Sequence, residues 1–277
     1  MSNTAKAPAA KPAANGKKSS GGIPAGIIMI LIFIVAVLIY LFFFGDGSHF
    51  EGGDNANDPL PGDYFGMVYK GGIIVPILLT CFLTAVVFTI ERIFTLSKAS
   101  GSGDLNGFVR KIQGLLNSND IPSAIKECDK QKGSLGNVTK AALNKYSQLV
   151  SDNSLDKEQK LSALSKEVEE ATSLEMPMLQ KNLPILATLA SVATLLGLLG
   201  TVIGMIRSFA ALGQSGAPDS SALANGISEA LINTALGIGT SAVCIIFYNY
   251  FTAKIDGMTY NIDEVGLSVN QNFASHN

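Results

Sequence analysis

The chain has no tryptophan, few charged residues and few cysteines. Charged side chains make up 15% of its 277 residues, the net charge is -2, and three cysteines are present. Cys81, Cys128 and Cys244 are spaced neither as metal ligands nor as a disulfide framework, so we expect them to be packing residues. The sequence also lacks a basic aromatic patch, a nucleotide-binding loop and a catalytic triad. These absences argue against nucleic-acid binding, a metal, a cofactor and enzymatic activity.

Apolar residues account for 47% of the chain and gather in four long runs. Runs of about 18 or more apolar residues are typical of membrane-spanning helices, because about 20 helical residues cross the hydrocarbon core. We therefore predict an all-α, polytopic membrane protein with four transmembrane helices and a helical cytoplasmic domain. The expected spans are residues 23–44, 72–96, 183–209 and 223–251.

The first run, Ile23–Phe44, contains no charged residue. Lys17 and Lys18 precede it, as in a signal peptide, but the apolar region of a signal peptide is only about 7–15 residues long. No small-residue cleavage site follows Phe44. The length of the run favours an uncleaved, additional N-terminal span, and a cleaved signal peptide is the alternative.

Lysine and arginine predict how the spans are oriented. The N-terminal tail carries lysines and no acid, the loop after the first span is rich in Asp, and most remaining bases lie between the second and third spans. The positive-inside rule therefore places both termini in the cytoplasm. The other segments are then a disordered cytoplasmic tail, a flexible periplasmic loop, a cytoplasmic helical domain, a periplasmic turn and a second cytoplasmic tail. These are residues 1–22, 45–71, 97–182, 210–222 and 256–277.

Within residues 97–182, apolar residues recur at helical spacing. Three stripes of this kind lie at residues 105–115, 138–149 and 161–171. Each predicts an amphipathic helix with one buried face. Ser154 is a candidate N-cap for the last of these helices, and Pro177 and Pro184 are expected to kink or break its connection to the third span. Without a catalytic motif, this domain is interpreted as a structural stalk and interface.

The third and fourth runs carry small residues at helix-packing positions. Gly200 and Gly204 form a GxxxG pair with Gly197 nearby, and Gly237 belongs to a small-residue face of the fourth run. Small residues let helix backbones approach closely in lipid. We expect these four glycines to pack helices, as required where several subunits surround a pore.

Glu229 is an acid well inside the fourth run. A charge at that depth costs about 2.5–3.5 kcal/mol on insertion scales and usually faces a cavity or a partner. Glu229 could be a proton relay or a gating ion pair with a partner helix, or it could snorkel outward, since it lies near the start of its span. Thr234 points about 140° away from it, so one lumen face cannot hold both equally. Thr201 and Thr234 could line a path or simply back-bond to their own helices.

Two motifs resemble the ExbB/TolQ/MotA proton-channel family. Residues 195–209, LLGLLGTVIGMIRSF, are similar to the family's GLLGTVxGMxxxF pattern, and residues 223–237, LANGISEALINTALG, are similar to its LAxGISEALxxTAxGL pattern. Glu91-Arg92 is similar to the ERL ending of an earlier span in the family. The order and spacing of these motifs make the resemblance specific. It covers about residues 72–255 and is strongest to the ExbB branch.

The resemblance implies a homo-oligomeric ring, five subunits by family analogy, whose third and fourth spans line a pore in the bacterial inner membrane. A pair of single-span ExbD-like helices with an essential membrane Asp would sit inside, and a TonB-like protein would receive their motion. Thr201 and Thr234 match the family's polar pore threonines, and Glu229 matches its acid on that helix. The expected function is to couple the proton gradient to TonB-dependent outer-membrane transport.

The sequence departs from the family pattern in two places. The N-terminal span is additional, and Thr194 stands near a position where family members often carry Pro. TolQ-like envelope maintenance and MotA-like motility are alternatives within the family, although the Ser-Glu-Ala-Leu run and the modest cytoplasmic domain favour ExbB or TolQ. A non-conducting membrane scaffold is the alternative from a different class.

Overall fold

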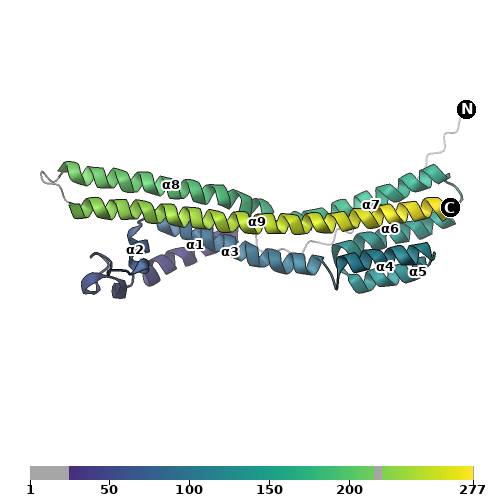
Figure 1. Ribbon diagram of the computed structural model, residues 1–277, viewed down its shortest axis with the longest axis horizontal. Coiled ribbons are helices and arrows are strands. Elements are labelled where there is room, and N and C mark those ends of the chain that lie inside the picture. The colour runs from purple at the N-terminus through teal and green to yellow at the C-terminus, as the bar shows by residue number, and fades with distance from the viewer. Residues whose placement is uncertain (1–24, 215–219, 277) are drawn as a thin grey trace, which may run out of the picture.

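The computed structural model describes residues 25–214 and 220–276, which form helices and loops without a β-strand. The molecule is long and narrow, and most helices run along its long axis (Figure 1). Four helical segments are long and apolar enough to cross a membrane. The predicted all-α fold with four spans is thus confirmed. The expected tail 1–22 and residues 215–219 of the expected turn lie outside the described residues.

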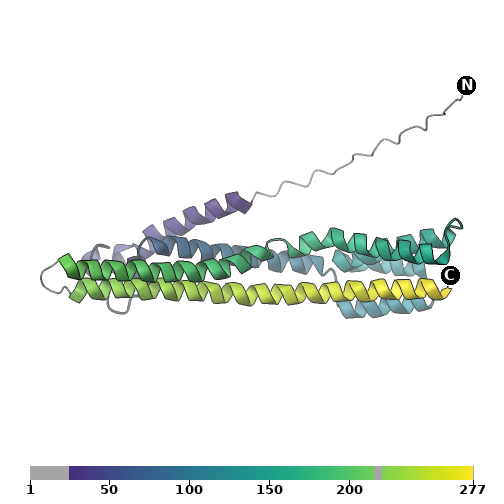
Figure 2. The ribbon, with the colours of Figure 1, turned by 90° about the horizontal axis from the view of Figure 1, so that it is seen from above.

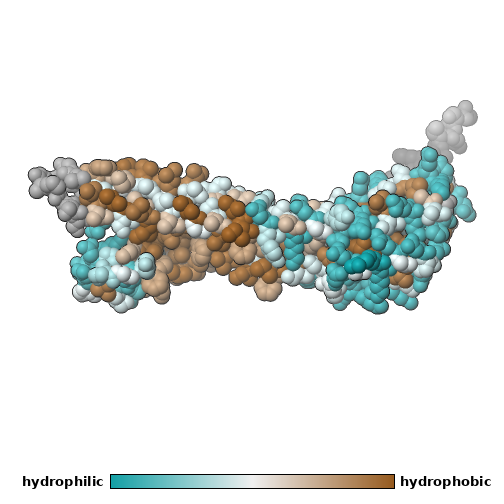
Figure 3. All heavy atoms as spheres, viewed as in Figure 1, coloured by the Kyte–Doolittle hydropathy of each residue, from teal (hydrophilic) through white to brown (hydrophobic). Residues whose placement is uncertain are grey.

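Hydrophobic and hydrophilic residues separate along the length of the molecule. Figure 3 shows hydrophobic surface over one half and hydrophilic surface over the half that holds α4, α5 and α6. Large apolar side chains lie exposed in the first half, among them Leu195, which is 64% exposed, and Ile246, also 64% exposed. A soluble domain rarely exposes a continuous apolar surface of this kind, whereas lipid accommodates it.

The first span is helix α1 (Ala25–Leu38) followed by a π-helical turn, η1 (Ile39–Phe44). It lies beside α3 (Ile74–Ala99) near η1 and diverges from the other helices toward the N-terminus (Figure 2). The side chains of α1 are apolar and mostly exposed. Because α1 is covered so little by the rest of the chain, most of its apolar surface is available to lipid.

The loop after the first span is folded, which corrects the expectation that this loop is flexible. It contains two 3-10 turns, η2 (Gly47–His49) and η3 (Glu51–Gly53), and the short helix α2 (Tyr64–Lys70). Asp46 accepts a hydrogen bond from the backbone N–H of Ser48, and Asp63 caps α2 by accepting two backbone N–H groups. Abundant Asp and Gly indicated flexibility, but the Asp side chains instead fix the turns.

Helices α8 (Leu183–Gln214) and α9 (Ser220–His276) form a long antiparallel hairpin, with α3 packed against both (Figure 1). Helix α9 is one continuous element and does not end with the membrane span. Ile262, Val265 and Phe273 are at most 1% exposed. Residues 256–276 are therefore the last part of a core helix, which corrects the predicted C-terminal tail. Their apolar residues keep helical spacing after the hydropathy falls.

Four further helices pack around the end of α9. They are α4 (Leu105–Asn117), α5 (Ile121–Gln131), α6 (Gly133–Ser151) and α7 (Lys157–Gln180). We call these four helices, together with residues 262–276 of α9, the extramembrane bundle. Its core includes Ile112, Leu143 and Leu164, one from each expected stripe region, all fully buried. The N-cap of α7 is Asp156, which forms a capping box with Gln159, rather than Ser154 as expected.

Helices α7 and α8 are separated by a short non-helical break at Lys181 and Asn182. The backbone of Asn182 is left-handed, with a φ of +64°. Pro177 stands inside α7 without ending it, and Pro184 occupies the first turn of α8, where proline is tolerated. These prolines were expected to kink or break the connection, but the interruption lies at Asn182, whose backbone is left-handed.

A fully buried arginine holds the break against α3. Arg92 donates hydrogen bonds to the backbone oxygens of Met178 and Leu179 at distances of 3.2 and 3.1 Å. Its guanidinium also pairs with the carboxylate of Glu91, which accepts a hydrogen bond from the Asn182 side chain at 3.1 Å. The Glu91-Arg92 pair thus satisfies carbonyls that the end of α7 leaves without helical partners.

Candidate functional site

The α8–α9 hairpin is packed through glycines. A Cβ atom added to Gly237 would lie 2.6 Å from the backbone oxygen of Ala193 and 2.8 Å from the Cα of Gly197. A Cβ on Gly197 would lie 3.1 Å from the Cα of Gly237. Gly200 and Gly204 lie in the same contact, where an added Cβ would come within 2.5 and 2.8 Å of α9 atoms. Because any side chain would meet backbone or a buried residue, this seam needs glycine.

Thr201 and Thr234 meet in this seam. Their hydroxyl groups form a hydrogen bond with each other across the two helices. Each hydroxyl also lies near the carbonyl oxygens of Gly197 and Ala230, at distances of 3.2 to 3.4 Å. A hydroxyl carries one proton and two acceptor lone pairs, so each can exchange its donor bond among these oxygens. The two threonines therefore form one polar group inside the helix pair, in addition to back-bonding to their own helices.

Glu229 forms an ion pair with Arg207. The Glu229 carboxylate and the Arg207 guanidinium are 2.8 Å apart, and their side chains are 13% and 54% exposed. Gly72, with a φ of +75°, lies directly against this pair, since an added Cβ would come within 2.5 Å of the carboxylate oxygen. The glycine before α3 thus makes room for the acid. The carboxylate is matched by a cation of the same chain, which lowers the cost of holding it at the end of the span.

The folded loop covers this end of the hairpin. Asn225 donates a hydrogen bond to the Asp58 carboxylate at 3.1 Å, and Lys70 donates one to the backbone oxygen of Ala56 at 3.0 Å. A polar hollow of about 600 Å³ lies between loop and hairpin, with Asp58, Lys70, Arg207 and Glu229 in its wall. Two acids and two bases therefore surround a space that reaches the Glu229–Arg207 pair.

The loop is held partly by a pair of titratable groups. His49 Nδ1 and Asp63 Oδ2 are 2.8 Å apart. The hydrogen bond from His49, followed by those from the backbone N–H groups of Gly66 and Phe65, lowers the pKa of Asp63. Asp63 therefore stays a carboxylate at neutral pH, as its role as the N-cap of α2 requires.

Asn233 lies between Glu229 and Thr234 along α9 and is fully buried. Its amide nitrogen donates a hydrogen bond to the backbone oxygen of Gly71 at 2.8 Å, while its side-chain oxygen has no hydrogen-bond partner among the described residues. Gly200 packs on its Cβ. Glu229 and Asn233 are four residues apart, so both face the start of α3, whereas Thr234 faces α8. The polar residues of α9 thus divide between two seams, in line with the 140° separation.

Some residues predicted separately lie together in the structure, and further residues belong to the same clusters. Thr201 meets Thr234, and the four glycines lie around them, but Glu229 belongs to a different cluster. Arg207 and Asn233 were not singled out. A base in the last turns of the third run, opposite an acid in the first turns of the fourth, was the available signal for Arg207.

Residues 130–264 match the model of the MotA/TolQ/ExbB proton channel family. This range begins near the end of α5 and includes α6, α7, α8 and most of α9. It begins later than the resemblance expected from residue 72 onward. The additional first span, the folded loop and α3 lie outside the matched range.

Curated relatives carry ExbB and TolQ names. An ExbB-like biopolymer transport protein of Synechocystis sp. is 40% identical over 30% of this chain and 41% of its own length. An ExbB homologue of Methanothermobacter thermautotrophicus is 27% identical over 76% of this chain and 72% of its own. The Tol-Pal system protein TolQ of Pseudomonas aeruginosa is 32% identical over 42% of this chain and 51% of its own. The chain thus spans about half or less of the length of two of these three relatives.

The matched range contains the whole glycine seam, the Thr201–Thr234 pair and the Glu229–Arg207 pair. The four spans add the membrane setting that such a hairpin needs. Residues 130–264 of the chain are therefore similar to the MotA/TolQ/ExbB proton channel family.

Proposed function

We propose that this chain is the ring-forming subunit of a proton-driven motor in the bacterial inner membrane. Both termini are cytoplasmic in this proposal, and several copies, five by family analogy, surround an ExbD-like partner with a membrane Asp. The partner passes its motion to a TonB-like protein and so drives outer-membrane transport. The observation that carries the proposal is the hydrogen-bonded pair of Thr201 and Thr234 in the seam of α8 and α9.

The two hydroxyls supply what a partner's acid needs at membrane depth. An ionised carboxylate in hydrocarbon is costly unless hydrogen-bond donors reach it. Each hydroxyl already has alternative acceptors in Gly197 and Ala230, so a donor bond can turn toward an incoming carboxylate while a carbonyl bond is given up. When the partner's Asp is protonated, that attraction weakens and the partner helix is free to shift.

The proton carrier belongs to the partner in this account. The described spans α1, α3, α8 and α9 contain no Asp within their membrane parts. Glu229 lies in those parts, but Arg207 neutralises it. We therefore assign Glu229 a gating or positioning contact at the loop end of the hairpin. Its breakage would open the polar hollow toward the seam.

Proton flux with and without the threonine hydroxyls tests the proposal. The chain is reconstituted with its membrane partner in vesicles that hold a pH-sensitive dye, and Thr201→Val and Thr234→Val are introduced together. These changes keep the shape and remove both hydroxyls, so we expect proton uptake to fall to the background of empty vesicles with the complex intact. The matched control is Thr188→Val on the same helix, whose exposed hydroxyl bonds to Pro184 of its own turn. Unchanged flux in the double variant would favour a non-conducting scaffold.

A TolQ-like role is the second candidate, because a TolQ protein is among the relatives. It predicts the same dependence on Thr201 and Thr234 but a different set of bound proteins. The proteins that copurify with the chain separate these roles. A TonB-like protein favours the transport role, Tol proteins favour envelope maintenance, and motility proteins favour a MotA-like drive.

A further inference from the structure

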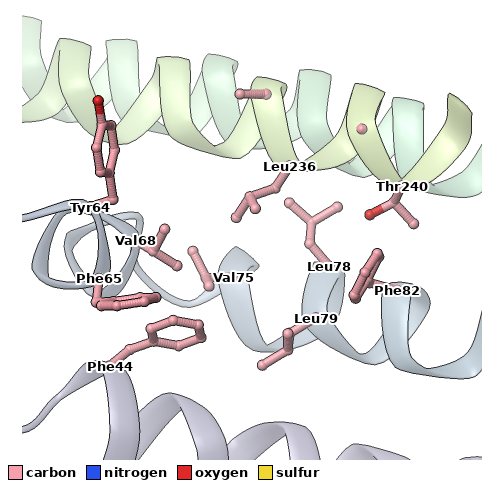
Figure 4. A pocket seen from close by; sticks show the side chains of 12 residues that line it. Phe44, Tyr64, Phe65, Val68, Val75, Leu78, Leu79, Phe82, Leu236 and Thr240 are labelled. Carbon is pink, nitrogen blue, oxygen red and sulfur yellow. The ribbon is translucent and has the colours of Figure 1, made fainter. Parts of the chain in front are cut away.

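An apolar cavity opens in the wall of the membrane half, between the first span and α9. Its volume is about 370 Å³, within the range of small-molecule sites. The π-helical turn η1, helix α2, helix α3 and helix α9 each supply part of its lining. Figure 4 shows the rings of Phe44 and Phe65 beside each other on one side, with Phe82 and Thr240 at the other end.

The chemistry of the lining excludes water and ions as occupants. Almost all atoms that line the cavity are apolar, and no charged residue is among them. The Tyr64 hydroxyl points away from the apolar side chains (Figure 4). A buried water needs two to four polar partners, which this lining does not offer. An empty space would forfeit the dispersion contacts of the rings around it, so hydrocarbon is the occupant that the lining favours.

The cavity joins the surface that faces lipid. Phe65 is 46% exposed and Phe82 is 39% exposed, so the rings that line the cavity also reach its outside. Tyr64 is 78% exposed at the mouth, where α2 leads from the folded loop to α3. Tyrosine is enriched at the depth of the lipid headgroups, where its ring is apolar and its hydroxyl is wet. The cavity therefore lies just below the headgroups, on the side of the loop.

We propose that this cavity binds one acyl chain of a phospholipid from the leaflet on the side of the loop. The surrounding bilayer is the source of the chain, because the mouth is continuous with the lipid-facing surface. Residues Phe44, Phe65 and Phe82 lie outside the family-matched range 130–264. Helices α3 and α9 supply eight of the twelve lining residues, α2 supplies three, and the additional span supplies Phe44. None of the twelve is Thr201 or Thr234, so the site is separate from the proposed proton path.

Gly239 provides a direct way to fill the cavity. It lies in the wall formed by α9, and an added Cβ would meet no atom within 4 Å. Gly239→Leu therefore puts a side chain into the space that the acyl chain would occupy, and leucine is also a better helix former than glycine. Gly257 offers a matched control, because it lies on the same helix, outside the cavity, and also has no atom within 4 Å of an added Cβ.

Phospholipids that copurify with the complex test the proposal. The full chain is purified with its partners in mild detergent, and retained phospholipids per chain are counted by mass spectrometry of the intact complex. We expect the unaltered protein and Gly257→Leu to retain a phospholipid per chain that Gly239→Leu loses. Equal retention in all three would overturn the proposal. A changed number of subunits in Gly239→Leu with unchanged lipid would also overturn it, and would identify a second copy of the chain as the occupant.

A fluorescence measurement keeps the test decisive if Gly239→Leu fails to assemble. The chain has no tryptophan, so Phe82→Trp introduces a single reporter at the cavity. In vesicles of phosphatidylcholine with brominated acyl chains, we expect bromine to quench this tryptophan strongly. Ala235→Leu, a second filling change in the same wall, should reduce the quenching, and Gly257→Leu should leave it unchanged. Equal quenching of Phe82→Trp with and without Ala235→Leu would contradict a bound acyl chain.

Discussion

The two halves of α9 pack by different means although they belong to one helix. In the membrane half, Gly237 lies so close to α8 that an added Cβ would come within 2.8 Å of the Cα of Gly197. In the extramembrane bundle, the same helix buries large side chains, including Val269 and Phe273, which are fully buried. One half is thus held by the approach of backbones, and the other by the removal of apolar surface from solvent.

The difference follows from the two solvents. Lipid tails are as apolar as leucine, so burying a large side chain between helices there brings little gain, and close packing of small residues brings more. In water, each buried apolar side chain contributes about 1.5–3 kcal/mol. On α9, the apolar core shared with α3 and α8 ends at Met258, and the core of the bundle begins at Ile262.

Buried asparagines occur in both halves of α9, and their hydrogen bonding does not follow this division. In the bundle, the side-chain oxygen of Asn272 accepts a hydrogen bond from Tyr146, and its nitrogen donates to the backbone oxygen of Leu116 at 2.8 Å. In the membrane half, Asn233 has a partner for its nitrogen alone. In the bundle, however, the side-chain oxygen of Asn270 is also buried without a partner among the described residues, so an unpaired amide oxygen does not distinguish the two halves.

The largest effect should come from breaking the apolar core of the bundle. Phe273→Ala removes a fully buried ring that packs edge-on against Tyr146. We expect the free energy of unfolding to fall by about 3–5 kcal/mol, measured by denaturant unfolding of the purified protein. Tyr260→Ala on the same helix is the control, because Tyr260 is 68% exposed. Equal losses in the two variants would contradict the description of this core.

Breaking the junction between the halves should have the next largest effect. Arg92→Met removes the donor to the buried backbone oxygen of Leu179 at the break between α7 and α8. An unsatisfied buried acceptor costs about 1–3 kcal/mol. We expect increased protease cleavage near Asn182, detected by mass spectrometry of the fragments. Lys98→Met, an exposed change on the same helix, should leave cleavage as it is.

A matched pair of glycine substitutions sharpens the comparison further. Gly237→Ala places a Cβ 2.6 Å from a backbone oxygen of α8 and should lower the free energy of unfolding by about 1–3 kcal/mol. Gly257→Ala adds the same methyl group where no atom lies within 4 Å and should raise it by about 0.5–1 kcal/mol. Thermal unfolding in detergent measures both, and shifts of the same sign would contradict the glycine seam.

The smallest effect concerns surface charge on the bundle. Hydrogen bonds from Lys111 and then Lys130 lower the pKa of Glu127 below its ordinary value of 4.5. A lowered pKa in the folded state contributes stability above the ordinary value, and that contribution is lost as pH falls through the folded pKa. Glu127→Gln should therefore lower the Tm slightly at neutral pH and leave it unchanged in acid. A difference in Tm between Glu127→Gln and the unaltered protein that persists in strong acid would contradict a charge effect.

Much of the fold was predictable because each solvent leaves its own pattern in the sequence. Long apolar runs indicated the four spans, and the stripe at residues 105–115 indicated α4. The prediction of a C-terminal tail was wrong because falling hydropathy was interpreted as the end of a helix. Ile262, Val265 and Val269 in fact continue the helical spacing.

The arrangement of the site was less predictable than its residues. Thr201 and Thr234 were named from the sequence, but their contact depends on how α8 and α9 are rotated about their axes. The same rotation brings Arg207 to Glu229, and Gly72, in the turn before α3, packs against this pair. Spacing along one helix does not determine such contacts, because they depend on the packing of all three.

The mass of the intact membrane complex tests the central claim most directly. The tagged chain is purified from its native membrane in mild detergent, and the complex and its subunits are weighed by mass spectrometry. The account predicts several copies of this chain around a small single-span protein that carries an Asp in its membrane segment. A stable monomer, or a multimer without an acid-bearing partner, would contradict it and leave Glu229 as the remaining candidate for the proton carrier.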